Sequence, residues 1–325
     1  MGWTLLIILL LTDFCALKKL EELNLADNDL EGILPSCLSN LTSLRILDLS
    51  INQSKGSLSS SMIDGLTALG YIDLSYNHFG GLFSFSSFAN HSKLKVIRLQ
   101  GESYLDGDCN FVIENSKIEI ENENPSWVPL FQLKVLVLSN NCLNKFAGNI
   151  PEFLFYQREL EFLDISHNRL HGSFPIWLLE NNTSLQLLHL QNNYFEGQFH
   201  LPPYQYKNLS GLDISNNLLQ GKLQENIGKM IPQLKFLNLS HNHIEGNLPS
   251  SVSDLGNLNK LDLSYNNFSR EVPKKLVGNC SSLNVLKLSN NNFHGEIFSK
   301  HFRIFNASLG VLELNDNHFT STLSF

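Results

Sequence analysis

Leucines recur at a fixed spacing along most of this chain, and this spacing constrains the fold more than any other feature. The clearest copy of the pattern runs from Leu234 to Asn257, with the sequence LKFLNLSHNHIEGNLPSSVSDLGN. Leucines occupy positions 1, 4 and 6 of this unit, an asparagine position 9, a glycine position 13 and a proline position 16. The next copy, LNKLDLSYNNF, begins at once at Leu258. The chain is therefore built from repeats of about 24 residues.

Each position of the unit has a mechanical role. Positions 4 and 6 alternate along a short strand, so their leucines point to one face while their neighbours face outward. The asparagine at position 9 is expected to hydrogen-bond backbone groups where the chain leaves the strand, and the glycine at position 13 allows backbone conformations that a side chain resists. One unit has too little apolar surface to fold alone, so the units must stack. The pattern LxxLxLxxNxLxGxIP is that of a plant-type leucine-rich repeat.

The same template fits about twelve successive units, of which the last is cut short. They begin at Leu20, Leu44, Leu69, Leu94, Leu133, Leu160, Leu185, Leu209, Leu234, Leu258, Leu283 and Leu309. Position 9 is asparagine in every unit except the fourth, which has Glu102 there. This register predicts an α/β solenoid, a right-handed leucine-rich-repeat horseshoe or superhelix with a parallel sheet on its concave face.

Two regions depart from the regular repeat. Residues 1–16 form a hydrophobic amino-terminal segment that resembles an incomplete signal peptide, because its apolar run from Leu5 to Leu11 is too short to span a bilayer. Residues 17–325 form the repeat domain, with an irregular acidic insertion at residues 100–132. The insertion holds seven acidic residues against Lys117, which leaves −6 of the formal net charge of −8. The net charge of −8 argues against a nucleic-acid partner, and the repeats outside the insertion are close to neutral, so they imply no strong electrostatic steering.

No metal, cofactor or catalytic site is predicted. The acidic insertion fails as a calcium-binding EF-hand loop from Asp106, because Phe111 stands at the glycine position and Lys117 at the twelfth. A nucleophile elbow, a P-loop, a zinc-binding HExxH and a dinucleotide-binding glycine motif are all absent from the sequence. The five cysteines lack zinc-site spacing, and their odd number suggests either a free thiol or a missing partner. We expect the missing partner, because the chain enters in the tail of an earlier repeat and stops inside a unit, as a fragment of a longer product would.

Sequons for N-linked glycosylation indicate the secretory route. We take as candidate acceptors those that avoid the strand leucines, and leave out Asn238, which lies beside two of them. The candidates are Asn40, Asn52, Asn90, Asn181, Asn182, Asn208, Asn267, Asn279 and Asn306. An Asn-, Leu- and Ser-rich repeat also creates such triplets by accident. The sequons therefore indicate the secretory route only when they are taken together.

The repeat register also predicts a binding surface. Positions 3, 5, 7, 8 and 10 of successive units are expected to line the concave face as ladders roughly 4.8 Å apart. Aromatic and ionisable residues at such positions are typical of recognition hot spots, although a repeat array needs a solvated face in any case and the aspartates at position 5 belong to the template. The candidates are Tyr71, Tyr76, His78, Phe162, His167, Arg169, His189, Tyr194, Phe236, His241, His243, Tyr265 and His318.

Several runs resemble a particular family more closely than the generic repeat does. They are LPSCLSNLTSLRILDLS, SFSSFANHSKLKVI, ENPSWVPLFQLKVL, FPIWLLENNTSL and LDISNN. Over residues 15–325 the chain is similar to the ectodomains of plant leucine-rich-repeat receptor-like proteins. That resemblance implies an extracellular module, followed by a membrane helix and a short tail, that signals through a partner receptor kinase with a leucine-rich-repeat ectodomain. In this chain, membrane attachment would need a segment outside the 325 residues.

The leading hypothesis is therefore a non-enzymatic recognition module that binds an extracellular peptide, glycan or protein in defence or development. Its expected location is the secretory pathway, and then the extracellular side of the plasma membrane for a full-length receptor or the extracellular space otherwise. Two alternatives stay open. One is a soluble inhibitor of a wall-degrading enzyme, similar to the polygalacturonase-inhibiting proteins, and the other is a truncated remnant without function.

Overall fold

The computed structural model describes residues 14–101, 118–120, 127–141, 143, 148–296 and 308–320. The chain divides into two compact units, Met1–Leu170 and His171–Phe325. Most of the acidic insertion at 100–132 lies outside the described residues, as does the candidate acceptor Asn306.

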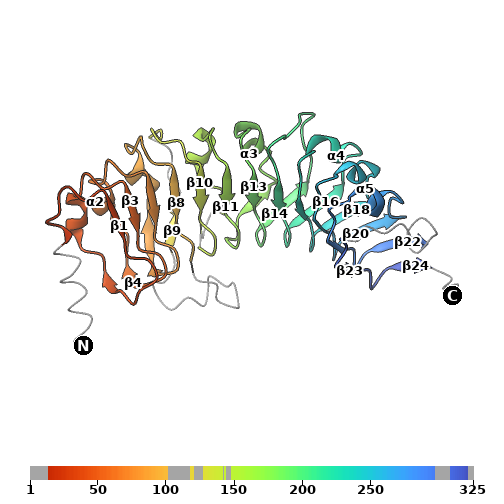
Figure 1. Cartoon of the computed structure of the whole chain (residues 1–325), viewed down its shortest axis with the longest axis horizontal. Helices are drawn as coiled ribbons and strands as arrows, with labels where there is room; N and C mark the ends of the chain where they lie inside the picture. Colours follow the sequence, from red (N-terminus) through yellow and green to blue (C-terminus); the bar gives the residue numbers. More distant parts are fainter. Residues whose placement is uncertain are drawn as a thin grey trace. The chain divides into compact units, whose positions relative to one another are not determined.

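Short strands from successive repeats form a parallel sheet in the first unit (Figure 1). In spatial order they are β1 (Glu22–Asn24), β3 (Ile46–Asp48), β5 (Tyr71–Asp73), β8 (Val96–Arg98), β10 (Val135–Val137) and β11 (Phe162–Asp164). The repeat positions stay in register, as in the pairing of Leu23 with Leu47. Smaller parallel sheets join β2 (Glu31–Ile33), β4 (Gln53–Gly56) and β6 (His78–Phe79), and β7 (Gly81–Phe83) with β9 (Ile118–Ile120).

The second unit contains two sheets, both parallel (Figure 1). Its first sheet consists of β13 (Leu187–His189), β15 (Gly211–Asp213), β17 (Phe236–Asn238), β19 (Lys260–Asp262), β21 (Val285–Lys287) and β23 (Val311–Glu313). Its second sheet consists of β12 (His171–Ser173), β14 (Tyr194–Gln198), β16 (Leu218–Lys222), β18 (His243–Gly246), β20 (Asn267–Arg270), β22 (Asn292–Glu296) and β24 (His318–Thr320). The repeated parallel strands confirm the predicted leucine-rich-repeat solenoid, whereas the second sheet was not predicted.

Single helical turns close most repeats on the side away from the first sheet. They are η1 (Ser36–Asn40), α2 (Ser60–Ile63), η2 (Phe85–Phe88) and η3 (Glu152–Tyr156) in the first unit, and α3 (Ile176–Asn181), α4 (Ile227–Met230), η4 (Ser250–Asp254) and α5 (Leu276–Asn279) in the second. The template proline is the residue before the turn at Pro35, Pro151, Pro175 and Pro249. Its ring fixes φ there, and no helical hydrogen bond needs its missing N–H. Between turns and sheet, leucines such as Leu234 and Leu239 are fully buried.

The asparagine at position 9 joins each repeat to its predecessor. The Nδ2 group of Asn242 donates to the carbonyl oxygen of Leu239 in its own repeat and to that of Ile214 in the repeat before. Its Oδ1 accepts from the backbone N–H of Leu219, also in the earlier repeat. The same pattern recurs at Asn52, Asn77, Asn217, Asn266, Asn291 and Asn317. The predicted role of this residue is confirmed and also links neighbouring repeats.

Left-handed backbone recurs at two repeat positions. Position 13 has a positive φ at its glycines, such as Gly246 at 84°. In the tenth repeat Arg270 replaces the glycine, yet it keeps a φ of 72°. Position 8 is also left-handed, with φ of 52° to 57° at non-glycine residues that include Ile51 and Tyr76. Residues with a β-carbon resist this region by roughly 1–2 kcal/mol, so packing and hydrogen bonds along the stack must hold it.

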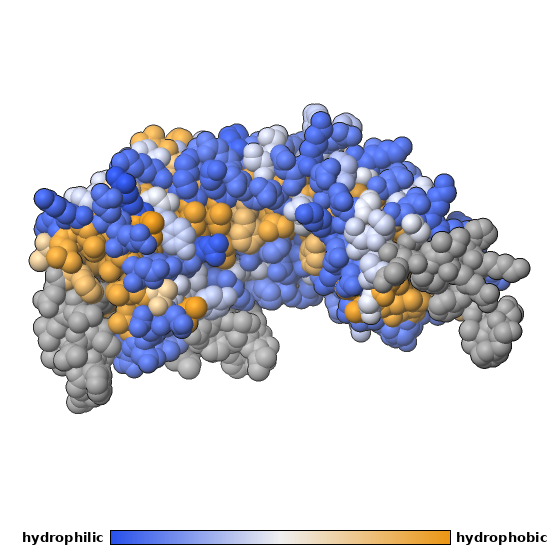
Figure 2. Space-filling model, in the orientation of Figure 1, coloured by the Kyte–Doolittle hydropathy of each residue, from blue (hydrophilic) through white to orange (hydrophobic). Residues whose placement is uncertain are grey.

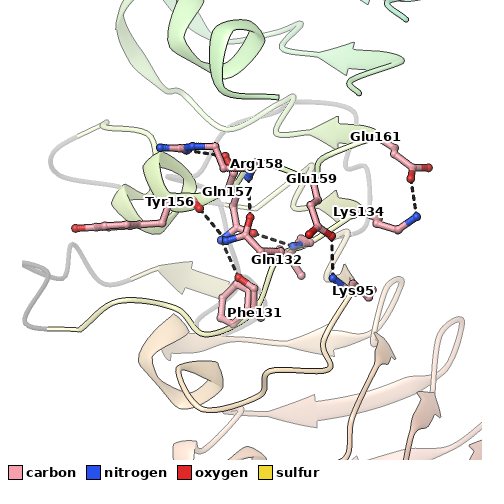
Figure 3. Close-up of polar contacts among 10 residues, drawn as sticks. Lys95, Phe131, Gln132, Lys134, Tyr156, Gln157, Arg158, Glu159 and Glu161 are labelled. Atoms are coloured by element: carbon pink, nitrogen blue, oxygen red, sulfur yellow. Dashed lines mark hydrogen bonds and ion pairs between the residues drawn. The ribbon is translucent and has the colours of Figure 1, made fainter. Parts of the chain in front are cut away.

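Glutamine side chains join the irregular fourth repeat to the fifth (Figure 3). The buried Gln157 accepts a hydrogen bond from the backbone N–H of Leu133, at 2.8 Å, through its Oε1. In return, Gln132 donates to the carbonyl oxygen of Tyr156 at 2.9 Å and accepts from the backbone N–H of Arg158 at 2.8 Å. These bonds add to the regular pairing of β10 with β8 and β11 beside the insertion.

A disulfide bond fastens the beginning of the described chain. Cys15 is bonded to Cys37 in η1, with their Cα atoms 5.7 Å apart. The sequence analysis left this pairing open. Cys280 is buried, and its thiol donates to the carbonyl oxygen of Val252, while Cys109 and Cys142 lie outside the described residues.

Candidate functional site

The predicted binding residues occupy three surfaces instead of one. Positions 3 and 5 face outward on the first sheets, where they place Tyr71, Phe162, His189 and Phe236. Position 8 forms the left-handed corner that holds Tyr76, His167, His241 and Tyr265. Position 10 follows that corner and places His78, Arg169, Tyr194, His243 and His318 at or beside the second series of strands. The candidates therefore lie on two series of strands and on the corner between them, and their role in ligand binding stays a prediction.

Position 7 is buried in most of the described repeats. Ser215 at this position is buried, and its backbone N–H and hydroxyl both donate to Oδ1 of Asp213 at position 5, at 3.0 and 2.6 Å. Asp48, Asp164 and Asp262 bind the serine two residues later in the same way. One oxygen of each carboxylate, Oδ1, thus accepts hydrogen bonds within the fold. This supports the interpretation of these aspartates as template residues.

Position 3 forms an apolar row on the first sheet of the second unit. The row consists of Leu187, Gly211, Phe236, Lys260, Val285 and Val311. Leu187 is 37% exposed and covers Gly211, because a β-carbon on that glycine would lie 2.6 Å from the leucine Cδ2. The ammonium group of Lys260 lies 5.0 Å from the ring centroid of Phe236, within the range of a cation–π contact.

Position 5 forms a polar and charged row beside it, which consists of His189, Asp213, Asn238, Asp262, Lys287 and Glu313. Asn238 donates to Oδ2 of Asp213 at 3.0 Å. Lys287 pairs with Glu313 at 2.8 Å, and this hydrogen bond raises the pKa of the lysine. The two rows run side by side across the strands, so each strand offers a position-3 side chain and, two residues later, a polar or charged side chain on the same face.

The first unit presents a different face. Tyr71 donates to Oδ2 of Asp73 at 3.3 Å, and Nε of Arg98 lies 4.0 Å from the same oxygen. Burial, and then the charge of Asp73, raise the pKa of Tyr71 to about 12, and burial also raises the pKa of Asp73. Figure 2 shows hydrophobic residues gathered over β10 and β11, the strands that carry Val135 and Phe162 at position 3.

Aromatic stacking organises the corner residues of the second unit. The rings of His241 and Tyr265, both at position 8, stack with centroids 4.1 Å apart. Tyr194 at position 10 stacks at 4.9 Å on His171 of β12. One pair therefore lies at the corner between the two sheets and the other on the second sheet.

Family models described as "Leucine rich repeat" match residues 18–79, and further repeat models match residues 159–181, 233–255 and 257–279. Receptor-like protein 1 of Arabidopsis thaliana is 43% identical over 179 residues, which are 55% of this chain and 15% of that protein. Receptor-like protein 13 of the same plant is 45% identical over 192 residues, or 59% and 16% of the two chains. The chain is thus similar to plant leucine-rich-repeat receptor-like proteins. It spans less than a fifth of the length of these two relatives.

Solved structures agree with this assignment. A structure titled "Crystal structure of a TDR receptor" matches with a TM-score of 0.77 and 26% identity, over 95% of this chain and 49% of that one. "Plant peptide hormone receptor RGFR1 in complex with RGF2" matches with a TM-score of 0.62 and 25% identity, over 94% and 53% of the two chains. The stated resemblance to the receptor-like proteins is thereby confirmed.

The face of this receptor-like chain includes residues that the sequence analysis missed. It selected aromatic and ionisable residues, and so passed over the apolar members of position 3, Leu187, Val135 and Val311. It also missed His171, because position 12 was not expected to lie on a second sheet. The signal was present in the sequence, since the predicted strand register alone assigns position 3 to the exposed face.

The glycosylation candidates of the receptor-like chain need one correction. Asn52 and Asn182 are buried, and their Nδ2 groups donate to the carbonyl oxygens of Leu25 and Leu178. Because both side chains are enclosed by protein, there is no room for a glycan on either nitrogen, and both are withdrawn as acceptors. Asn181 is half-buried, and the remaining described candidates are exposed, namely Asn40, Asn90, Asn208, Asn267 and Asn279.

The described part of this chain contains no group of three or more His, Cys, Asp or Glu residues arranged to hold a metal ion. Among the helices of those same residues, none is both long and apolar enough to cross a bilayer.

Proposed function

We propose that this chain is part of a non-enzymatic receptor ectodomain that recognises an extracellular peptide on the first sheet of its second unit. The observation that carries the proposal is the pair of rows at positions 3 and 5. An apolar row that includes Leu187 and Phe236 lies beside a charged row that includes Asp262 and Lys287. Such a face suits recognition because it holds rigid anchors next to groups that fix orientation.

The spacing of the rows suits an extended chain. Neighbouring strands present equivalent side chains roughly 4.8 Å apart. A peptide that crosses the strands can therefore seat apolar side chains on the position-3 row while its polar groups meet the position-5 row. The solved peptide hormone receptor with 25% identity supports a peptide over a glycan or a folded protein as the ligand.

The similarity to receptor-like proteins supports a wider receptor function. We propose that the chain acts on the extracellular side of the plasma membrane, in defence or development, and that its signal passes through a co-receptor kinase with a leucine-rich-repeat ectodomain. The Cys15–Cys37 disulfide supports this route, because such bonds persist in oxidising compartments. Membrane attachment would depend on a segment outside these residues.

The test begins with the full chain, secreted from plant or insect cells, and a phage-displayed library of short random peptides. We expect the wild-type protein to enrich peptides that combine apolar and charged residues. Phe236→Ser and Leu187→Ser should each weaken binding of those peptides about tenfold, the loss that corresponds to about 1.4 kcal/mol.

The matched control is Phe155→Ser, since Phe155 is also an exposed apolar side chain but lies on η3 of the first unit. It should leave the affinity unchanged. Failure to enrich any peptide, or equal binding by wild type and the Phe236→Ser protein, would refute recognition on this face.

A further inference from the structure

A pocket of about 420 Å³ lies in the second unit, away from the two rows. It lies between the end of α3 and residues 204–206. Its lining consists of Leu179, Glu180, Thr183, Tyr204, Gln205 and Tyr206. The volume falls within the range of pockets that hold small ligands, roughly 300–1,000 Å³.

The pocket exists because one repeat lacks the helical turn of its neighbours. Residues 199–210 contain no helix, whereas α3 and α4 close the repeats on either side. Pro202 and Pro203 stand where that turn would form, and two successive prolines remove the N–H groups that a helix needs. The chain therefore crosses this part of the surface as an open loop beside α3.

The lining combines aromatic faces with hydrogen-bonding groups. Tyr204 is 62% exposed, so its ring is available at the mouth, whereas Tyr206 is only 9% exposed. The hydroxyl of Tyr206 is buried without a hydrogen-bond partner in the described structure. Burial, and then the charge of Glu180, raise the pKa of Tyr206 to about 12. A buried hydroxyl without a partner is unfavourable, so a ligand that supplies an acceptor would be stabilised here.

These groups match a sugar ring better than a purely apolar ligand. The face of an aromatic ring is electron-rich and attracts polarised C–H groups, which a pyranose presents on one side. The carboxylate of Glu180, the amide of Gln205 and the hydroxyl of Thr183 stand around the mouth, where they can bind sugar hydroxyls.

A glycosylation acceptor points at this pocket. Asn208 is exposed and begins the sequon Asn-Leu-Ser. Its Nδ2 donates to the carbonyl oxygen of Thr183, a lining residue, at 2.9 Å. N-glycosylation leaves one hydrogen on that nitrogen, so this bond can persist while the sugar takes the other valence.

We propose that the pocket is a saccharide site that seats the first sugar of an N-linked glycan on Asn208. Nδ2 of Asn208 forms a bond to C1 of the sugar of a lipid-pyrophosphate-linked oligosaccharide and loses a proton, and the lipid pyrophosphate leaves. The ring then covers Tyr204 and closes the open loop against α3. This site is separate from the peptide-binding face and does not depend on that function.

The experiment uses the full chain secreted from plant or insect cells. Glycopeptide mass spectrometry measures occupancy of Asn208, and tyrosine nitration by tetranitromethane reports which rings are covered. We expect Asn208 to be occupied and nitration of Tyr204 to be several-fold slower than in Asn208→Gln. Tyr265, which is 50% exposed, should be nitrated equally in both proteins. Asn279→Gln, which removes another exposed sequon of the same unit, is the matched control and should leave Tyr204 protected.

Enzymatic trimming identifies the sugar that matters. An endoglycosidase that leaves one sugar on asparagine should preserve the protection of Tyr204, and complete removal should abolish it and lower Tm by roughly 2–4 °C. Tyr204→Ala should keep the glycan but lose this difference in Tm. An unoccupied Asn208, or equal nitration of Tyr204 with and without its glycan, overturns the proposal. Saturable binding of free chitobiose to Asn208→Gln together with an unoccupied Asn208 in wild type would assign the pocket to a sugar from solution instead.

Discussion

The imidazole of His241 lies flat on the phenol ring of Tyr265, with an interplanar angle of 12°. Both residues sit at position 8 of adjacent repeats, and both have a φ of 53°. The two left-handed corners thereby hold these rings face to face across the boundary between the two repeats.

This stack should be measurable as a coupling energy. We expect His241→Asn and Tyr265→Asn to be non-additive by about 0.5–1 kcal/mol in urea unfolding, the range of an aromatic pair. Asparagine is chosen because it tolerates a left-handed backbone. The double-mutant cycle of these two changes therefore measures the contact between the rings and not backbone strain. Additive single and double variants would show that the contact contributes nothing.

Asn242 should be among the most sensitive polar residues of the second unit. Its removal leaves the N–H of Leu219 without its side-chain acceptor, and the carbonyl oxygen of Ile214 keeps only the donor group of Asn217. Because one unsatisfied buried group costs about 1–3 kcal/mol, Asn242→Ala should lower the free energy of unfolding by about that amount. Asn257→Ala, at an exposed asparagine that bonds only Gln233, is the control and should change it by less than about 0.5 kcal/mol.

The sequence predicts the frame of this protein better than its surface. The leucines at positions 4 and 6 and the asparagine at position 9 have one stable arrangement each, because burial and backbone hydrogen bonds fix them, and the structure confirms both. Position 8 could not be predicted in the same way. Ile51 and Tyr76 have side chains that oppose a left-handed φ, so local preference indicates the wrong conformation and only the stacked neighbours impose it.

The binding face shows the same division. The register predicted from the leucines places Phe236 at an exposed position 3, and the structure agrees. The burial of Ser215 at position 7 was not foreseen, because it depends on the bond to Asp213 and on the turn that follows. The second sheet depends on pairing between repeats, which no single repeat encodes.

Arg270 offers a direct test of strain at position 13. Its exposed side chain holds a φ of 72°, where the other described repeats with a positive φ have glycine. Arg270→Gly removes roughly 1–2 kcal/mol of backbone strain and adds chain entropy to the unfolded state, so we expect a net gain of about 0.5 kcal/mol. A lower urea midpoint for this variant would contradict the strain argument.

Replacement of a position-13 glycine by alanine separates the cost of backbone strain from the cost of steric collision. Gly172→Ala meets no atom within 4 Å, so its cost is the strain at φ 100° alone. Gly246→Ala also brings a β-carbon to 2.9 Å from Cγ of Lys222. Both should destabilise the protein by about 1–2 kcal/mol, with the larger loss at Gly246. Truncation of Lys222 to alanine should reduce the loss at Gly246 to that of Gly172.

The Cys15–Cys37 bond should stabilise the first unit. It closes a loop with a sequence separation of 22, for which loss of chain entropy in the unfolded state corresponds to about 3 kcal/mol. Dithiothreitol should lower Tm of the wild-type protein but not of the double variant Cys15→Ser with Cys37→Ser. Equal dithiothreitol sensitivity of both proteins would exclude a stabilising disulfide.

Cys280 should resist alkylation in the folded protein at pH 8, since burial raises the pKa of its thiol to about 11.

His91 should make the first unit sensitive to acid. Its side chain is 1% exposed, and Nε2 donates to the carbonyl oxygen of Ile63 at 3.1 Å, while Nδ1 has no hydrogen-bond partner in the described structure. Burial lowers the pKa of this imidazole, against smaller opposing influences from the backbone carbonyl groups of Ile63 and Phe88 and from the charge of Asp64. The unfolded chain therefore takes up a proton near pH 6.5 while the folded chain does not. The contribution of His91 to the free energy of unfolding is fully present above that pH. It falls as the pH drops toward the folded pKa, by at most about 1.4 kcal/mol per pH unit.

Urea midpoints between pH 7.5 and 4.5 should show this slope in wild type and in His200→Gln, which alters an exposed histidine. His91→Gln should be less stable at neutral pH, but the slope between pH 6.5 and the folded pKa should disappear, and an unchanged slope would exclude His91 as its origin.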